Sequence, residues 1–228
     1  MFDLISRYDN QLWDAFWVTI ELTAFSAVGA LIIGTLVAAM RVSPIPVARW
    51  IGTAYVTVFR NTPLTLILVF CSLGLYTTLG IKLASESSGL DFLPTNNFRF
   101  AVLGLSVYTA SFVCESLRAG INTVPLGQSE AGRSLGLTFG QNLRHVVLPQ
   151  AFRSVIAPLG SVLIALTKNS TIASAIGVAE AAALMASMNE TEADILAIGA
   201  IFALGFVILT LPTGLLFGWL AKRFEVKR

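Results

Sequence analysis

The amino-acid sequence predicts an all-α membrane protein with about five transmembrane helices. Of its 228 residues, 55% are hydrophobic and only 12% are charged, whereas soluble domains have roughly 25% charged residues. The mean hydropathy is +0.77. Apolar runs of about 20 residues, the length that an α-helix needs to cross a bilayer, recur along the chain. We therefore expect residues 1–228 to form a single transmembrane domain.

The first three apolar runs cover residues 16–40, 64–83 and 98–117. Arg41 and the prolines that follow it end the first run. A semi-polar stretch before the second run, residues 47–62, is typical of an amphipathic helix on the membrane surface.

The longest polar stretch, residues 118–153, follows the third run and is predicted to be a loop. The fourth run covers residues 154–188 and is interrupted by the polar residues 168–171. The fifth covers residues 195–220 and ends at Lys222 and Arg223. Five crossings place the two termini on opposite sides of the membrane.

The distribution of Lys and Arg predicts which side is cytoplasmic. Three cations lie on one side, namely Arg7, Lys82 and Arg99. Ten lie on the other: Arg41, Arg49, Arg118, Arg133, Arg144, Arg153, Lys222, Arg223, Lys227 and Arg228. We therefore expect the N-terminus, the loop 82–97 and the acidic stretch 190–194 outside, and the loop 118–153 and the C-terminus in the cytoplasm.

Composition also limits the partners and cofactors of the chain. The 15 Lys and Arg nearly balance the 13 Asp and Glu, so nothing indicates a nucleic-acid partner. The only histidine is His145, and Cys71 and Cys114 both lie in apolar runs. This pattern favours neither a metal site nor a disulfide framework. No Gly-x-x-x-x-Gly-Lys-Ser/Thr loop is present, so we expect no ATP site in this chain.

The cytoplasmic loop contains a segment, Gly127–Pro149, with the pattern of a short helical hairpin that another protein binds. Apolar residues recur at helical spacing after Glu130, and Gly136 and Gly140 permit a change of direction. Leu148 and Pro149 are predicted to stop its second half. The alternative is an ordinary connector that lies on the lipid headgroups.

This segment resembles the signature of permease subunits of binding-protein-dependent ABC importers: Glu-Ala-Ala, three residues, Gly, nine residues, Ile, one residue, Leu-Pro. The matching positions are Glu130, Ala131, Gly132, Gly136, Val146, Leu148 and Pro149. Two of them depart from the signature, because Gly132 replaces an alanine and Val146 an isoleucine. The spacing is intact, and it favours docking over the connector alternative.

Three further segments resemble the polar amino acid permeases of this family, including the glutamate-uptake permeases of actinobacteria. They are Arg60-Asn61-Thr62-Pro63-Leu64, Glu115 to Ile121, and Lys168-Asn169-Ser170-Thr171-Ile172. Asn61 stands where the family has glycine.

The resemblance implies a type I ABC importer permease in a bacterial cell membrane. It further implies a heterodimer with a related permease, two cytoplasmic ATPase subunits that bind ATP and Mg²⁺, and an extracellular amino-acid-binding protein. This chain would then be non-catalytic. The coupling role would fall to Glu130, Ala131, Gly132, Gly136, Leu148 and Pro149. The implied cargo is a polar amino acid, with L-glutamate favoured and glutamine, aspartate or a basic amino acid as alternatives.

Ionisable groups at membrane depth are expensive, so Lys168 is a candidate for the substrate path. It would attract a carboxylate, while Asn169, Ser170 and Thr171 would supply hydrogen bonds. The alternative is a structural cation paired with a carboxylate of Glu21, Glu115 or Glu180.

Three other side chains are weaker candidates. Arg60 either lies at the cytoplasmic boundary, which we favour, or faces the translocation path if the second crossing starts near Ile51. Tyr108 either faces the path or packs in the bundle. Glu115 and Arg118 are three residues apart, and this spacing predicts a local ion pair.

Two other functional classes compete with an ATP-driven importer. An intramembrane enzyme would need a catalytic set, but neither His-Glu-x-x-His nor Gly-x-Ser-x-Gly is present. An ATP-independent channel or carrier would transport without nucleotide. The ATP dependence of uptake distinguishes it from an importer.

Overall fold

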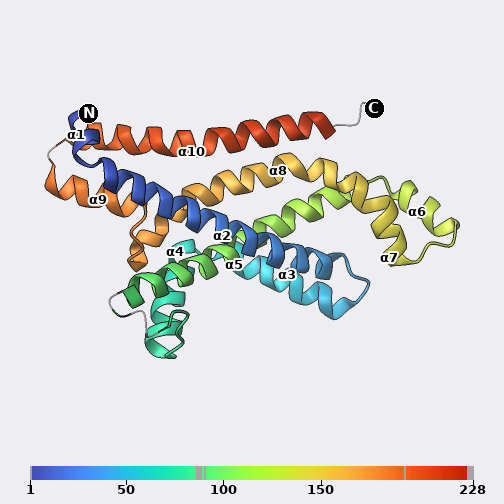
Figure 1. The fold of residues 1–228 in the computed structure, drawn as a ribbon. Coiled ribbons are helices and arrows are strands. Elements are labelled where there is room, and N and C mark those ends of the chain that lie inside the picture. Colours follow the sequence, from blue (N-terminus) through green and yellow to red (C-terminus); the bar gives the residue numbers. More distant parts are fainter. Residues whose placement is uncertain (1, 86–88, 90, 193, 225–228) are drawn as a thin grey trace.

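A computed structural model of the chain describes residues 2–85, 89, 91–192 and 194–224, all of which form helices or the connections between them. The predicted terminal cations Lys227 and Arg228 lie outside the described residues. Four described segments are long and apolar enough to cross a membrane. They are α2 (Asp9–Val42), α5 (Phe92–Asn122), the segment Phe139–Ile176 that contains α8 (Leu148–Asn169), and α10 (Ile195–Phe224). Figure 1 shows these long helices running along the length of the molecule.

The second predicted crossing is part of a sharply bent pair of helices. The helix α3 (Pro46–Asn61) is followed by α4 (Leu64–Val69) and the π-helical η1 (Phe70–Thr78). Between α3 and the segment formed by α4 and η1, the chain bends by 104°. The bend follows from Pro63, because a residue before proline avoids the helical region, and Thr62 is extended at ψ 132°. A fifth crossing exists if the bent pair spans the membrane. It would then begin at Pro46 and end at Thr78, not at residues 64 and 83.

The fourth predicted crossing also has different boundaries. The helix α8 contains 22 residues, about 33 Å at 1.5 Å per residue, and it continues through Lys168. The break follows the lysine: the 3-10 helix η4 (Ser170–Ile176) ends at Gly177, whose φ of 80° favours glycine. The chain then forms α9 (Ala181–Thr191), which packs against α2 and α10. The interruption therefore marks the end of α8 and lies inside the candidate span Phe139–Ile176.

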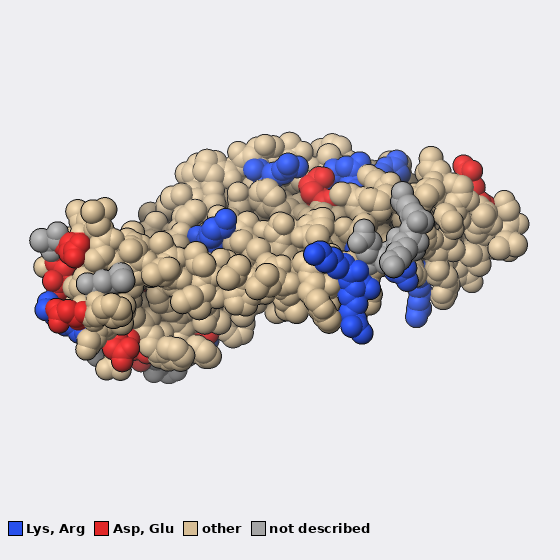
Figure 2. All heavy atoms as spheres, turned by 90° about the horizontal axis from the view of Figure 1, so that it is seen from above, with Lys and Arg blue, Asp and Glu red and all other residues tan. Residues whose placement is uncertain are grey.

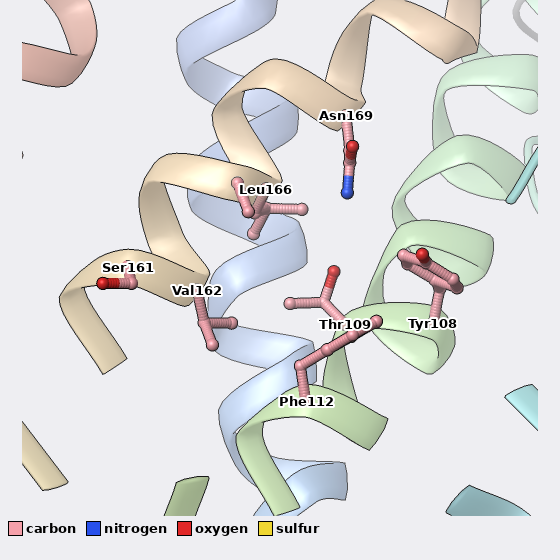
Figure 3. Close-up of a pocket in the computed structure, with 8 residues that line it drawn as sticks. Tyr108, Thr109, Phe112, Ser161, Val162, Leu166 and Asn169 are labelled. Atoms are coloured by element: carbon pink, nitrogen blue, oxygen red, sulfur yellow. The ribbon is translucent and has the colours of Figure 1, made fainter. Parts of the chain in front are cut away.

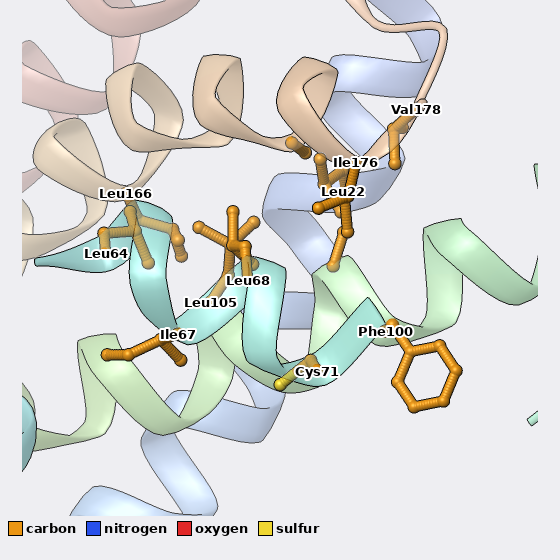
Figure 4. Packing of buried hydrophobic residues seen from close by; sticks show 12 residues of the cluster. Leu22, Leu64, Ile67, Leu68, Cys71, Phe100, Leu105, Leu166, Ile176 and Val178 are labelled. Carbon is orange, nitrogen blue, oxygen red and sulfur yellow. The ribbon is translucent and has the colours of Figure 1, made fainter. Parts of the chain in front are cut away.

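The core that supports the bundle lies where α2 and α5 cross. A Cβ at Gly34 of α2 would come within 2.7 Å of the Val113 side chain of α5, so the glycine permits close approach, as membrane helix pairs require. Beside this crossing, Leu68 of α4, Leu105 of α5 and Leu166 of α8 form one buried cluster (Figure 4). The cluster fixes α5 and α8 relative to each other.

The two ends of the molecule differ in charge. The N-terminus with α1 (Phe2–Arg7) and α9 lies at one end, and the C-terminal part of α10 lies at the other, beside α6 (Leu126–Ser134) and α7 (Phe139–Asn142) (Figure 1). On the face drawn in Figure 2, acidic side chains gather at the first end and most Lys and Arg lie over the other half.

Candidate functional site

The predicted docking loop is a helical hairpin. Glu130, Ala131 and Gly132 lie on α6, and Gly136 follows with a φ of 84°. The amide of Gly136 donates to the carbonyl of Arg133 at 2.9 Å, and the amide of Leu137 donates to the carbonyl of Gly132 at 3.2 Å. This ending needs a left-handed residue, which is the reason for glycine there. The change of direction predicted at Gly136 is therefore present, whereas Gly140 has no positive φ.

The second half of the hairpin leads into α8 without a stop. Thr138 and Gln141 form a capping box at the start of α7, and η3 (Leu143–Val147) continues into α8. Leu148 and Pro149 are therefore the first residues of α8 and not the end of a helix. The proline is tolerated because a first-turn residue needs no amide donor.

The departure of Gly132 from the signature alanine has a local reason. Asn142 is buried against α6, where its Nδ2 donates to the backbone and the hydroxyl of Ser129, both at 2.9 Å. A Cβ at residue 132 would collide with the Oδ1 of Asn142. The glycine thus leaves room for an asparagine that holds the two arms of the hairpin together.

The hairpin also exposes large apolar side chains. Leu126 is 80% exposed and Leu135 is 84% exposed. Leu126 is the first residue of α6 and Leu135 follows its last residue, so each end of α6 presents an exposed apolar side chain.

A cavity of about 360 Å³ lies between α5 and α8. Its lining consists of Tyr108, Thr109, Phe112, Ser161, Val162, Ala165, Leu166 and Asn169. Figure 3 shows the amide of Asn169 and the side chains of Tyr108 and Thr109 directed toward the same space. The hydroxyl of Thr109 is buried and has no hydrogen-bond partner. An apolar wall with a few convergent polar groups is the usual form of a small-molecule site.

The structure brings three of the predicted path residues to this cavity. Tyr108 and Asn169 line it directly. The guanidinium of Arg60 lies 5.9 Å from the ring of Phe112, another lining residue. Arg60 is at the end of α3, next to the bend. Arg60 is exposed and lies near the cavity without lining it, and its position at the cytoplasmic boundary stays a prediction.

The other path candidates lie outside the lining. Lys168 is exposed on the side of α8 away from the buried core. The hydroxyl of the buried Ser170 donates to the carbonyl of Thr167 at 2.7 Å. The hydroxyl of Thr171 donates to the carbonyl of Lys168, also at 2.7 Å. Both hydroxyls therefore stabilise the end of their own helix.

The three carboxylates considered as partners of Lys168 are occupied elsewhere. Glu21 accepts from the indole of Trp17 at 2.8 Å. Glu115 pairs with Arg41, and Glu180 accepts from the first amides of α9. A structural ion pair of Lys168 is thus absent from the described residues.

The ion pair predicted between Glu115 and Arg118 is wrong. Glu115 instead pairs with Arg41, which reaches it from the facing helix α2. The side chain of Arg41 is only 9% exposed, so leaving it unpaired would cost more than leaving the half-exposed Arg118 without a partner.

Sequence reasoning missed three residues of these sites. Phe112 follows Tyr108 by four residues, so helical spacing alone placed it on the same face. Thr109 is a polar residue inside an apolar run, which is a weaker signal. Nothing in the sequence pattern indicates the role of Asn142, because this role depends on its contact with α6 in the folded chain.

Residues 30–226 match the family described as the binding-protein-dependent transport system inner membrane component. The chain is 58% identical to the glutamate transport system permease protein GluC of Corynebacterium efficiens over 218 residues, 95% of each chain. It is 36% identical to the glutamate/aspartate import permease protein GltJ of Escherichia coli over 183 residues, which cover 78% of this chain and 72% of the relative.

A solved amino acid ABC transporter superimposes on the structure with a TM-score of 0.84, at 27% identity and over 98% of both chains. The match covers the hairpin as well as the long helices, so the whole chain has the fold of a type I ABC importer permease. The sequence match and the fold agree that the chain belongs to the family of inner membrane components of binding-protein-dependent transport systems.

Proposed function

We propose that this chain forms the translocation path of an ATP-driven importer of L-glutamate, together with a second, related permease. The observation that carries the proposal is the 58% identity, over 95% of both chains, with a permease named for glutamate transport. Aspartate is the second candidate, because a relative at 36% identity is named for both amino acids.

The cavity between α5 and α8 is our candidate for a part of the path. The amide of Asn169 and the unpartnered hydroxyl of Thr109 offer hydrogen bonds to a carboxylate or an ammonium group. Arg60, which stacks on Phe112, adds a positive charge near the cavity. Lys168 lies one residue from Asn169 and would attract the anionic substrate toward the cavity without lining it.

The hairpin α6–α7 is our candidate for the contact with the ATPase. Two cytoplasmic ATPase subunits would bind ATP and Mg²⁺, and their closure would move the hairpin as a rigid body. Its continuity with α8, through η3, would pass this movement to a wall of the cavity. The binding protein would deliver substrate at the opposite, acidic end of the molecule.

The test is uptake by the complete transporter, with both permeases, the ATPase subunits and the binding protein, in lipid vesicles. We expect L-glutamate uptake only when ATP is available to the ATPase. Unlabelled glutamate should compete more strongly than aspartate, glutamine or arginine. Uptake that is indifferent to ATP would indicate a channel or carrier, and stronger competition by another amino acid would reassign the cargo.

The cavity is tested by a matched pair of variants from the same helix. Asn169→Leu should lower the uptake rate by about tenfold, because one hydrogen bond to a charged ligand is lost. Gln150→Leu makes a similar change at an exposed position of α8 outside the cavity lining and should leave uptake nearly unchanged. Lys168→Met in the same assay shows whether the exposed cation contributes. Equal uptake by Asn169→Leu and Gln150→Leu would exclude the cavity from the path.

A further inference from the structure

A second cavity, of about 590 Å³, lies between the α2–α3 connection and the docking hairpin. One wall comes from Val42, Ser43, Pro44 and Arg49, and the other from Arg133, Leu137 and Phe139. We call it the basic cleft. It joins the end of a membrane-spanning helix to the hairpin, two parts of the chain that are far apart in the sequence.

The basic cleft contains two arginines and no carboxylate. The Nη1 of Arg49 donates to the carbonyls of Ser43 and Pro44, at 3.1 and 3.0 Å, and these bonds hold its guanidinium at the cleft. Among the described residues, neither Arg49 nor Arg133 forms an ion pair. Two unpaired cations beside one cavity repel each other unless an anion binds there.

The position of the basic cleft indicates which anion. Val42 is the last residue of α2, one of the helices long and apolar enough to cross a membrane, so the cleft lies at the end of a candidate crossing. Next to it, Ile45, Val47 and Trp50 are 59%, 65% and 72% exposed. Exposed aliphatic side chains with a tryptophan are typical of the membrane interface. The cleft therefore opens at the depth of lipid headgroups.

We propose that the basic cleft binds the phosphate of an anionic phospholipid headgroup. The planar guanidinium matches two phosphate oxygens at once, while Leu137 and Phe139 offer apolar contact to the adjoining glycerol and acyl chain. A lipid held between Arg49 and Arg133 ties the hairpin to the α2–α3 connection. An acidic segment of the ATPase fits less well, because the exposed Ile45, Val47 and Trp50 beside the cleft are typical of a surface that faces lipid.

The test measures lipid retained by the complete transporter. The complex is purified from nanodiscs that contain phosphatidylcholine and phosphatidylglycerol, and native mass spectrometry counts bound phosphatidylglycerol and ATPase subunits together. The variants are Arg49→Gln, and Arg49→Gln with Arg133→Gln. The control is Lys222→Gln with Arg223→Gln, which removes the same charge from the last turn of α10, outside the cleft.

We expect the control to retain phosphatidylglycerol as the parent does, and the double variant to retain at least tenfold less. Arg49→Gln alone should also lose lipid while keeping its ATPase subunits, since Arg49 lies outside the hairpin. Equal retention by the double variant and the control overturns the proposal. Dissociation of the ATPase in every variant that loses lipid also overturns it, and assigns the cleft to the ATPase. These outcomes do not depend on which amino acid is transported.

Discussion

At the residue scale, the signature position Gly132 depends on a neighbour that the signature does not include. Asn142 fills the space above the glycine, and both its amide hydrogen bonds go to Ser129 of α6. Restoring the signature alanine should therefore harm this particular chain. Gly132→Ala should lower the free energy of unfolding by about 1–3 kcal/mol, the usual cost of overpacking.

The test of this dependence is a double variant. In Gly132→Ala with Asn142→Ala, the new methyl group meets no side-chain oxygen, so ATP-driven uptake lost in the single variant should return in part. Thermal unfolding and uptake are measured on the same preparations. A single variant as stable and active as the parent would show that Asn142 moves aside without cost.

A second prediction at this scale concerns Glu180, which is fully buried before α9 and outside the candidate membrane spans. Burial raises its pKa to about 7 from 4.5, although the amides of Ala182 and Ala183 oppose the shift. The folded state therefore binds more protons than the unfolded state between these values. The free energy of unfolding should fall as the pH rises from about 4.5 to about 7.

Glu180→Gln should remove this part of the pH dependence, measured as the melting temperature from pH 4 to pH 8. The same slope in both proteins would contradict the assignment.

At the element scale, the pairing of α2 with α5 depends on close packing and on one ion pair, that of Arg41 with Glu115. Arg41→Met should leave the half-buried Glu115 without its partner. We expect a loss of about 2–3 kcal/mol in the free energy of unfolding, less than for a fully buried pair because Glu115 is 31% exposed. The matched control is Arg118→Met, on the same helix as Glu115, which should lose less than about 1 kcal/mol. If thermal unfolding shows the larger loss for Arg118→Met, the local pair predicted from spacing is the correct one.

The elements show which features a sequence can predict. Hydrophobic length was enough to find the long helices, because the cost of a charge or a polar backbone in lipid marks their ends. The spacing from Glu130 to Pro149 was enough to find the hairpin and its turn at Gly136. The start of α4 after Pro63 and the interruption at residues 168–171 were also predicted. The start of α8 was missed, because Leu148 and Pro149 were expected to end a helix and instead begin one. The partner of Glu115 was missed because Arg41 is near it only in the folded chain.

In the whole molecule, the hairpin and the C-terminal half of α10 lie in the same half, and the N-terminus and α9 lie in the other (Figure 1). The predicted excess of Lys and Arg at the hairpin end favours a cytoplasmic position for it. The cargo would then enter from the acidic end. This orientation makes the hairpin accessible to a nucleotide-dependent partner, so the coupling proposal depends on it.

Thiol labelling in intact cells tests the orientation. The two native cysteines, Cys71 and Cys114, are both buried, so the parent protein should react little with a membrane-impermeant maleimide. Glu190→Cys lies exposed near the end of α9 and should be labelled from outside. Gly127→Cys, where a Cβ meets nothing within 4 Å, should be labelled only after the membrane is permeabilised. The reverse pattern would place the hairpin outside the cell, where no ATPase could drive it.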